Sequence, residues 1–184
     1  MNISKQEAQE SLAEIDSAIS QTRKAMGRHL GPILMLWGVI WAIGYSLTQF
    51  IPRDGLAYWL VLDGLGFLGT WLCVKKVRNN FRRPGLGRVA VAWVILFGYM
   101  ILWGFLVSPI GGHSQIAFFS TVCMCGYAIM GLWMSRFLLW LGLSVTALTL
   151  VGFYFFSGWF ALWMGITGGG ALFLSGFYIH KTWK

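Results

Sequence analysis

Apolar stretches of about 20 residues recur along nearly the whole of this chain, and this pattern constrains its fold more than any other feature. A helix of that length crosses the hydrocarbon core of a bilayer and satisfies its own backbone hydrogen bonds there. We therefore expect an all-α membrane bundle of six transmembrane helices. With errors of a few residues at each end, the predicted spans are 30–51, 56–77, 88–108, 113–134, 137–156 and 159–180.

Composition and charge agree with a membrane chain. Apolar residues make up 57% of the sequence and charged residues only 11%. A net charge of +8 would suggest nucleic-acid binding in a soluble protein. In a membrane protein, basic residues set the topology and contact anionic lipid, so we expect the bilayer to be the partner and nucleic acid not to be.

A polar segment, residues 1–28, precedes the predicted transmembrane domain over residues 29–184. Ser4 and Glu7 have the spacing of a capping box, which predicts a helix start. Apolar or small residues then recur at alternating spacings of four and three, namely Ala8, Leu12, Ile15, Ile19, Thr22 and Met26. Such a narrow stripe is typical of coiled coils. Two interpretations stay open: a helix that joins copies of the chain or binds a partner, and an amphipathic helix on the membrane surface.

The basic loop, residues 75–88, determines the predicted orientation. It contains no acidic residue and holds six basic ones: Lys75, Lys76, Arg78, Arg82, Arg83 and Arg88. The other Lys and Arg, apart from Arg53, fall in the N-terminal segment, the fourth connection or the C-terminus. The positive-inside rule then places both termini and this loop in the cytoplasm, in a membrane of the bacterial inner-membrane type. The loop is also the predicted contact for anionic lipid or a cytoplasmic partner.

The spans carry an internal pattern that favours three copies of one helical hairpin. Glycines stand 28 residues apart in each predicted pair of spans: Gly38 and Gly66, Gly98 and Gly126, Gly142 and Gly170. Overlaying the pairs at offsets of 60 and 104 needs no gap, and it aligns Trp59 with Phe119 and Trp163. Parallel repeats of this kind occur in transporters.

Asp63 is the one acidic residue within a predicted span. An ionised carboxylate at membrane depth costs roughly 2.5–3.5 kcal/mol on insertion scales, so we expect it to face the bundle interior or water. Trp59, Gly66 and Thr70 share its face at helical spacing. The functional hypothesis is a proton- or cation-linked site or a ligand anchor, and the structural alternative is a carboxyl bonded to a neighbouring helix.

Tryptophan and glycine supply the remaining candidates. Trp41 and Trp163 lie deep in their spans and, with Thr167, are candidates to line a ligand pathway. Four glycines are expected to let helices pack closely: Gly64, Gly69, Gly165 and Gly169. The glycine run 168–170 also has the composition of a helix that loosens midway and exposes backbone to a cavity.

Catalytic motifs are absent from the sequence. It has no GxSxG, HExxH, CxxC or P-loop, and its three histidines stand at span ends. We therefore expect no enzyme activity, no metal and no cofactor, and no motif identifies a family. The function that these features favour is a transporter or channel with a polar interior around Asp63. The alternatives are a scaffold or regulatory subunit that docks a partner through its N-terminal helix and basic loop, and a small-molecule-binding subunit of a larger transporter.

Overall fold

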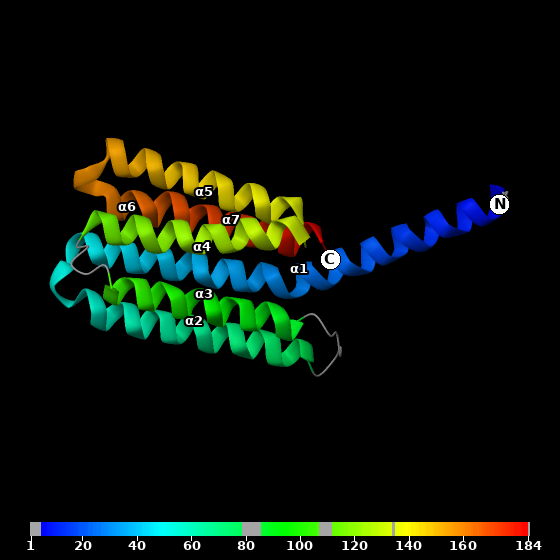
Figure 1. Ribbon diagram of the computed structural model, residues 1–184, viewed down its shortest axis with the longest axis horizontal. Helices are drawn as coiled ribbons and strands as arrows, with labels where there is room; N and C mark the ends of the chain where they lie inside the picture. The colour runs from blue at the N-terminus through cyan, green and yellow to red at the C-terminus, as the bar shows by residue number, and fades with distance from the viewer. Residues whose placement is uncertain (1–4, 79–85, 107–111, 134, 184) are drawn as a thin grey trace.

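The computed structural model describes residues 5–78, 86–106, 112–133 and 135–183, and these residues form helices without a strand (Figure 1). Five of the helical segments are long and apolar enough to cross a membrane: Leu30–Phe50, Ala57–Lys75, His113–Leu132, Arg136–Phe155 and Ser157–Thr182. A sixth apolar segment, Val91–Gly104, is shorter. The all-helical prediction is confirmed, and five of the six predicted spans have the length and composition of membrane helices.

The first helix, α1 (Lys5–Phe50), is 46 residues long and joins the polar N-terminal segment to the first span without a break. Residues 28 and 29, where we placed a boundary, lie inside it. Pro32 also lies inside this helix, although it would fall near the start of a separate first span. At about 1.5 Å per residue, α1 is far longer than a bilayer is thick, and its N-terminal half projects beyond the other helices (Figure 1).

The next four helices begin and end within a few residues of the predicted spans. They are α2 (Gly55–Arg78), α3 (Leu86–Leu106), α4 (His113–Trp133) and α5 (Arg136–Phe155). A short 3₁₀ turn, η1 (Pro52–Asp54), joins α1 to α2, with proline in its first turn, where a missing amide donor costs little. Ser135 caps α5 by accepting a hydrogen bond from the Phe137 amide at 3.3 Å.

The last predicted span is divided into three pieces. It follows the 3₁₀ turn η2 (Ser157–Trp159) and consists of α6 (Phe160–Met164), a π-helical turn η3 (Gly165–Gly169) and α7 (Gly170–Thr182). The π turn covers the sequence GITGG and overlaps the glycine run 168–170, whose composition predicted a loosened helix. A π turn inside a helix is rare and widens it locally, as an added residue does.

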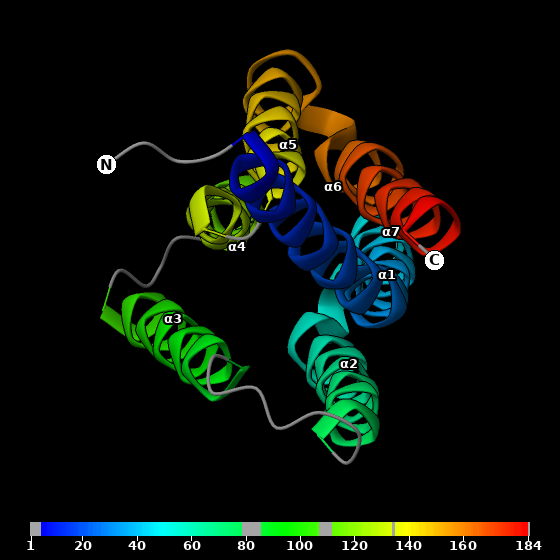
Figure 2. The same ribbon diagram turned by 90° about the vertical axis from the view of Figure 1, so that its right-hand side faces the viewer.

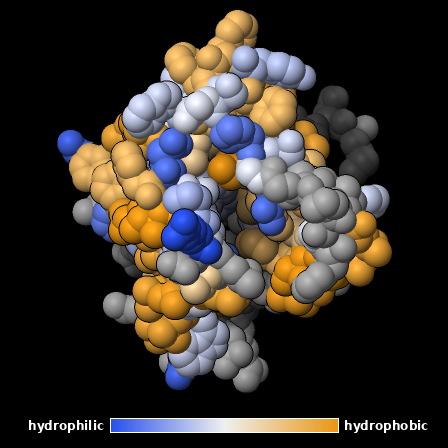
Figure 3. All heavy atoms as spheres, turned by 90° about the vertical axis from the view of Figure 1, so that its left-hand side faces the viewer, coloured by the Kyte–Doolittle hydropathy of each residue, from blue (hydrophilic) through white to orange (hydrophobic). Residues whose placement is uncertain are grey.

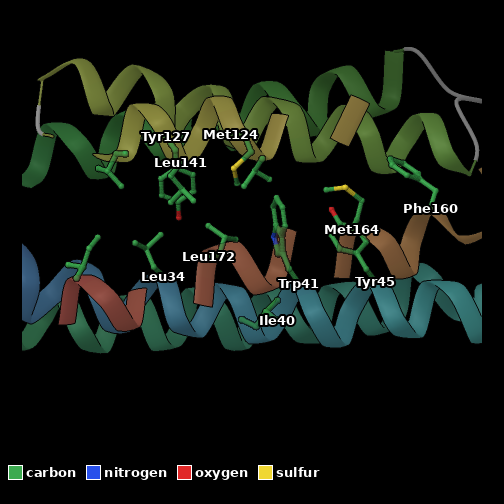
Figure 4. Packing of buried hydrophobic residues seen from close by; sticks show 13 residues of the cluster. Leu34, Ile40, Trp41, Tyr45, Met124, Tyr127, Leu141, Phe160, Met164 and Leu172 are labelled. Carbon is green, nitrogen blue, oxygen red and sulfur yellow. The ribbon is translucent and has the colours of Figure 1, made fainter. Parts of the chain in front are cut away.

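Viewed along their length, the helices follow one another around a ring, in the order α1, α2, α3, α4, α5 and α6–α7 (Figure 2). The most extensive packing joins α1 to α7 and α4 to α5. The core lies where these two pairs face each other, as Figure 4 shows for Leu34, Trp41 and Leu172 on one side and Met124 and Leu141 on the other. By contrast, α2 and α3 stand at the edge of the bundle.

Candidate functional site

The face of α2 that carries Asp63 is turned toward α1. The Trp59 ring lies over Gly44, and its Nε1 donates a hydrogen bond to the Thr48 hydroxyl at 3.1 Å. Three turns along α2, Thr70 accepts a hydrogen bond from Trp37 Nε1, also at 3.1 Å. Both ends of the predicted polar face are therefore fixed to α1 by indole–hydroxyl bonds.

Gly66 lies between those two bonds and is buried beneath the side chains of Trp37 and Ile40. A Cβ at this position would lie 2.7 Å from Ile40 Cδ1 and 2.9 Å from the Trp37 ring. The contacts of Trp59, Gly66 and Thr70 show that these residues occupy one face of α2. Asp63, at the matching helical spacing, belongs to the same face.

Asp63 itself is half-buried. Within the described part of the chain, its carboxylate forms no hydrogen bond and no ion pair. The residues that share its face, Trp59, Gly66 and Thr70, all contact α1, so Asp63 lies on the side of α2 that faces the bundle. A carboxylate in that position is available to a proton, a cation or a polar ligand.

Tyr45 and Ser120 form a buried polar link that sequence reasoning missed. Their hydroxyl oxygens are 2.7 Å apart, and the bond joins α1 to α4 across the bundle. The Tyr45 ring also makes edge contacts with Trp41 and Trp59, with centroids 5.5 and 5.0 Å apart. A sequence signal existed, because Tyr45 follows Trp41 by one helical turn and Ser120 is a polar residue in mid-span.

Trp41 belongs to the same neighbourhood, whereas Trp163 and Thr167 do not. Trp41 is 6% exposed and packs on Gly168 of the π turn. Trp163 instead faces α5, where its Nε1 donates to the Leu148 carbonyl oxygen at 2.9 Å. The Thr167 hydroxyl donates to the Trp163 carbonyl oxygen at 2.7 Å, within its own helix. The structure thus brings Trp41 to the Asp63 side of the bundle and leaves the other two on the α5–α6 side.

The predicted packing glycines divide in a similar way. Gly165 and Gly169 lie against the α1 backbone, and a Cβ on Gly169 would be 2.8 Å from the Ala42 amide nitrogen. Gly69 lies under the Leu36 side chain. Gly64 differs from the expectation, because no atom lies within 4 Å of its Cβ position and the residue is exposed.

Of the basic loop, the structure describes the side chain of Lys75. Its Nζ lies over the exposed Trp71 ring, 4.8 Å from the centroid, in a cation–π contact. Arg82 and Arg83 lie outside the described residues, and so do the side chains of Lys76, Arg78 and Arg88. The apolar stripe of residues 1–28 lies mostly outside them too, although Leu12 is 62% exposed.

The end of the bundle that carries η1 and η2 is hollowed between apolar walls, and hydrophilic residues appear among them (Figure 3). Among the described residues, no group of three His, Cys, Asp or Glu is placed to hold a metal ion. The site therefore consists of one unpaired carboxylate, a buried hydroxyl pair and several indole rings. Comparison with protein-family models, curated proteins and solved structures finds no match for this chain.

Proposed function

We propose that this protein is a non-enzymatic transporter- or channel-like membrane protein whose interior pathway passes Asp63. The observation that carries this proposal is the half-buried carboxylate on the inward side of α2, without a hydrogen bond or ion pair among the described residues. Because an ionised carboxylate in lipid is costly, such a group is retained where water or a ligand reaches it. The ring order of the helices and the hollowed end in Figure 3 support the same interpretation.

The proposed topology has six spans, with α3 as the sixth. Its 21 residues run roughly parallel to the other helices in Figure 1, although its clearly apolar part, Val91–Gly104, is shorter than the others. Both termini and the loop 75–88 then lie in the cytoplasm of a bacterial cell, against an inner membrane whose anionic lipids the basic residues contact.

We further propose that the bundle is built from three hairpins of common origin: α1–α2, α3–α4 and α5 with α6–α7. The support is a contact that recurs at matching positions, between an aromatic residue in the second helix and a residue 15 positions earlier in the first. The contacting pairs are Trp59 with Gly44, Phe119 with Gly104, and Trp163 with Leu148. Offsets of 60 and 104 relate all three pairs.

Access of water to Asp63 tests the pathway. In a chain whose native cysteines are replaced by serine, Asp63→Cys should react with a membrane-impermeant thiosulfonate. The matched control is Val61→Cys on the same helix, because Val61 is 63% exposed on the outer surface and lies against lipid in the proposed topology. We expect labelling at position 63 and none at 61. Equal protection of both thiols in a correctly folded chain would contradict the pathway.

The alternative function is a scaffold or regulatory subunit, and the unbroken α1 favours it. Its N-terminal half extends away from the bundle as part of a 46-residue helix, a shape suited to holding a cytoplasmic partner or a second copy (Figure 1). Deleting residues 1–26 would then abolish complex formation while the bundle stays folded. A deletion that leaves every complex intact would remove this alternative.

A further inference from the structure

Backbone contact between two hairpins is seen where α4 meets α5. We call the boundary between the second helix of one hairpin and the first helix of another a seam. At the α4–α5 seam, a Cβ on Gly142 would lie 2.6 Å from the Met124 carbonyl oxygen and 2.8 Å from the Ala128 amide nitrogen. Only glycine permits that approach, which is how helices associate closely in membranes.

The α7–α1 seam repeats this contact. A Cβ on Gly38 would lie 2.8 Å from the Gly169 carbonyl oxygen and 2.6 Å from the Phe173 amide nitrogen. Gly38 and Gly142 are 104 positions apart, the offset of the proposed repeat. A second pair of contacts agrees: Gly131 lies against the Leu139 amide nitrogen, and Gly176 against that of Met35.

The π turn accounts for the one irregularity in this correspondence. Between the second and third hairpins the offset is 44 before the turn, from Phe119 to Trp163, but 45 after it, from Gly131 to Gly176. The turn η3 lies between these positions and accommodates one added residue. The overlay of the hairpins therefore needs a one-residue gap at the π turn, contrary to the expectation from sequence, and Gly170 is not the equivalent of Gly126. With this gap the two seams share one register.

At the α2–α3 seam, Gly98 is the equivalent of Gly142, and Gly64 and Leu68 are the equivalents of Met124 and Ala128. The same register therefore pairs Gly98 with Gly64 and Leu68. In the structure, both glycines are exposed and no atom lies within 4 Å of either Cβ position. One side-chain contact nevertheless joins the two helices. Phe67 of α2 meets Phe97 of α3 edge-on, with ring centroids 5.1 Å apart. Side chains of α2 and α3 therefore meet at this seam, but the two helix backbones are apart (Figure 2).

Trp71 is a residue by which this seam differs from the other two in sequence. It occupies the position that Gly131 and Gly176 hold in the other two second helices. Its ring is 55% exposed and carries the Lys75 ammonium group on one face. An indole at this position does not fit between two helix backbones in contact.

We infer that α3 has a second position, in which Gly98 rests on the α2 backbone at Gly64 and Leu68, and that Trp71 opposes this closure. Asp63 immediately precedes Gly64, so closure brings α3 against the part of α2 that holds the carboxylate. The inference rests on the hairpin repeat and not on transport. Its test is separate from the labelling of position 63, so either can fail alone.

Disulfide formation tests the closed position. In the full-length chain in proteoliposomes, with native cysteines replaced, the pair Gly64→Cys and Gly98→Cys should cross-link within one chain under mild oxidation. At the other two seams, the equivalents of Gly98 are Gly142 and Gly38, and those of Gly64 are Met124 and Gly169. A Cβ on each of the first two would lie 2.6 and 2.8 Å from the carbonyl oxygen of its partner, an approach within disulfide range. The control pair, Gly64→Cys with Tyr99→Cys, places the second thiol at the same depth but about 100° around α3. It should not cross-link, and maleimide after unfolding checks that all thiols are reactive.

A substitution at Trp71 sharpens the result. Trp71→Gly should increase the cross-linked fraction of the 64–98 pair, because it restores the glycine of the other seams. Two outcomes would overturn the inference: no product from the 64–98 pair with both thiols reactive, or a product of doubled mass, which would show contact between copies.

Discussion

Two parts of this bundle have similar apolar sequences and different packing. Among the side chains that the structure describes, α1, α4, α5 and α6–α7 supply nearly all of the buried core, whereas α2 contributes no buried large apolar side chain and α3 contributes Met100. Because lipid is as apolar as leucine, apolarity alone does not drive helices together in a membrane. Close backbone approach does, and it occurs here where glycines meet the facing backbone.

The largest expected difference between the two parts is in the core. Phe160 is fully buried in α6, while Phe67 of α2 is 47% exposed. Phe160→Ala should cost about 3 kcal/mol of unfolding free energy, the low end of the range for soluble cores, because the water-transfer contribution is missing. Phe67→Ala should cost about 1 kcal/mol or less. Thermal unfolding in detergent measures both, and equal shifts in Tm would show that the α2 side is as tightly packed as the core.

Equivalent glycines give the next largest contrast. Gly142→Ala places a methyl group against the α4 backbone and should cost about 1–3 kcal/mol. Gly98→Ala, at the equivalent position of the second hairpin, meets open space and should leave the stability unchanged or raise it slightly, since alanine favours helix. The same unfolding assay applies. A loss of stability at Gly98 equal to that at Gly142 would mean that the α2–α3 seam is closed in the detergent-solubilised protein.

The smallest effect concerns the polar link between α1 and α4. Tyr45→Phe leaves the buried Ser120 hydroxyl without its partner and should cost about 1 kcal/mol, as membrane hydrogen bonds do. Adding Ser120→Ala should recover part of that loss, because the unpaired hydroxyl is then removed. Tyr58→Phe, which breaks a bond to Thr48 at the bundle end, is the control. Additive losses in the double variant would show that the two hydroxyls are not coupled.

Much of the fold could be predicted from the sequence, because span length and polarity are local properties. The helix ends agree with the predicted spans within a few residues, and the polar face of α2 follows from helical spacing. The continuity of α1 through Pro32 was missed, because a proline and a change in polarity together suggest a boundary when packing is unknown.

Long-range geometry could not be predicted in the same way. Trp41 and Trp163 look alike as deep tryptophans, yet one packs on the π turn near Tyr45 and the other bonds to α5. Which wall of the ring a residue faces depends on the order of the helices in space, and a single sequence does not contain that order. The π turn was anticipated only as a weak point in a glycine run, and its role in keeping the register emerged from the contacts of Gly131 and Gly176.

The unbroken α1 has a mechanical consequence. Residues 5 to 50 form one continuous helix, which packs along its C-terminal half against α7 and extends beyond the bundle at the other end (Figure 1). A sideways push on the projecting end therefore acts as a torque about the edge of the bundle. The same helix holds Trp37, Trp41 and Tyr45, whose side chains contact α2, the π turn and α4, so we expect a displacement of the projecting half to reach these three contacts.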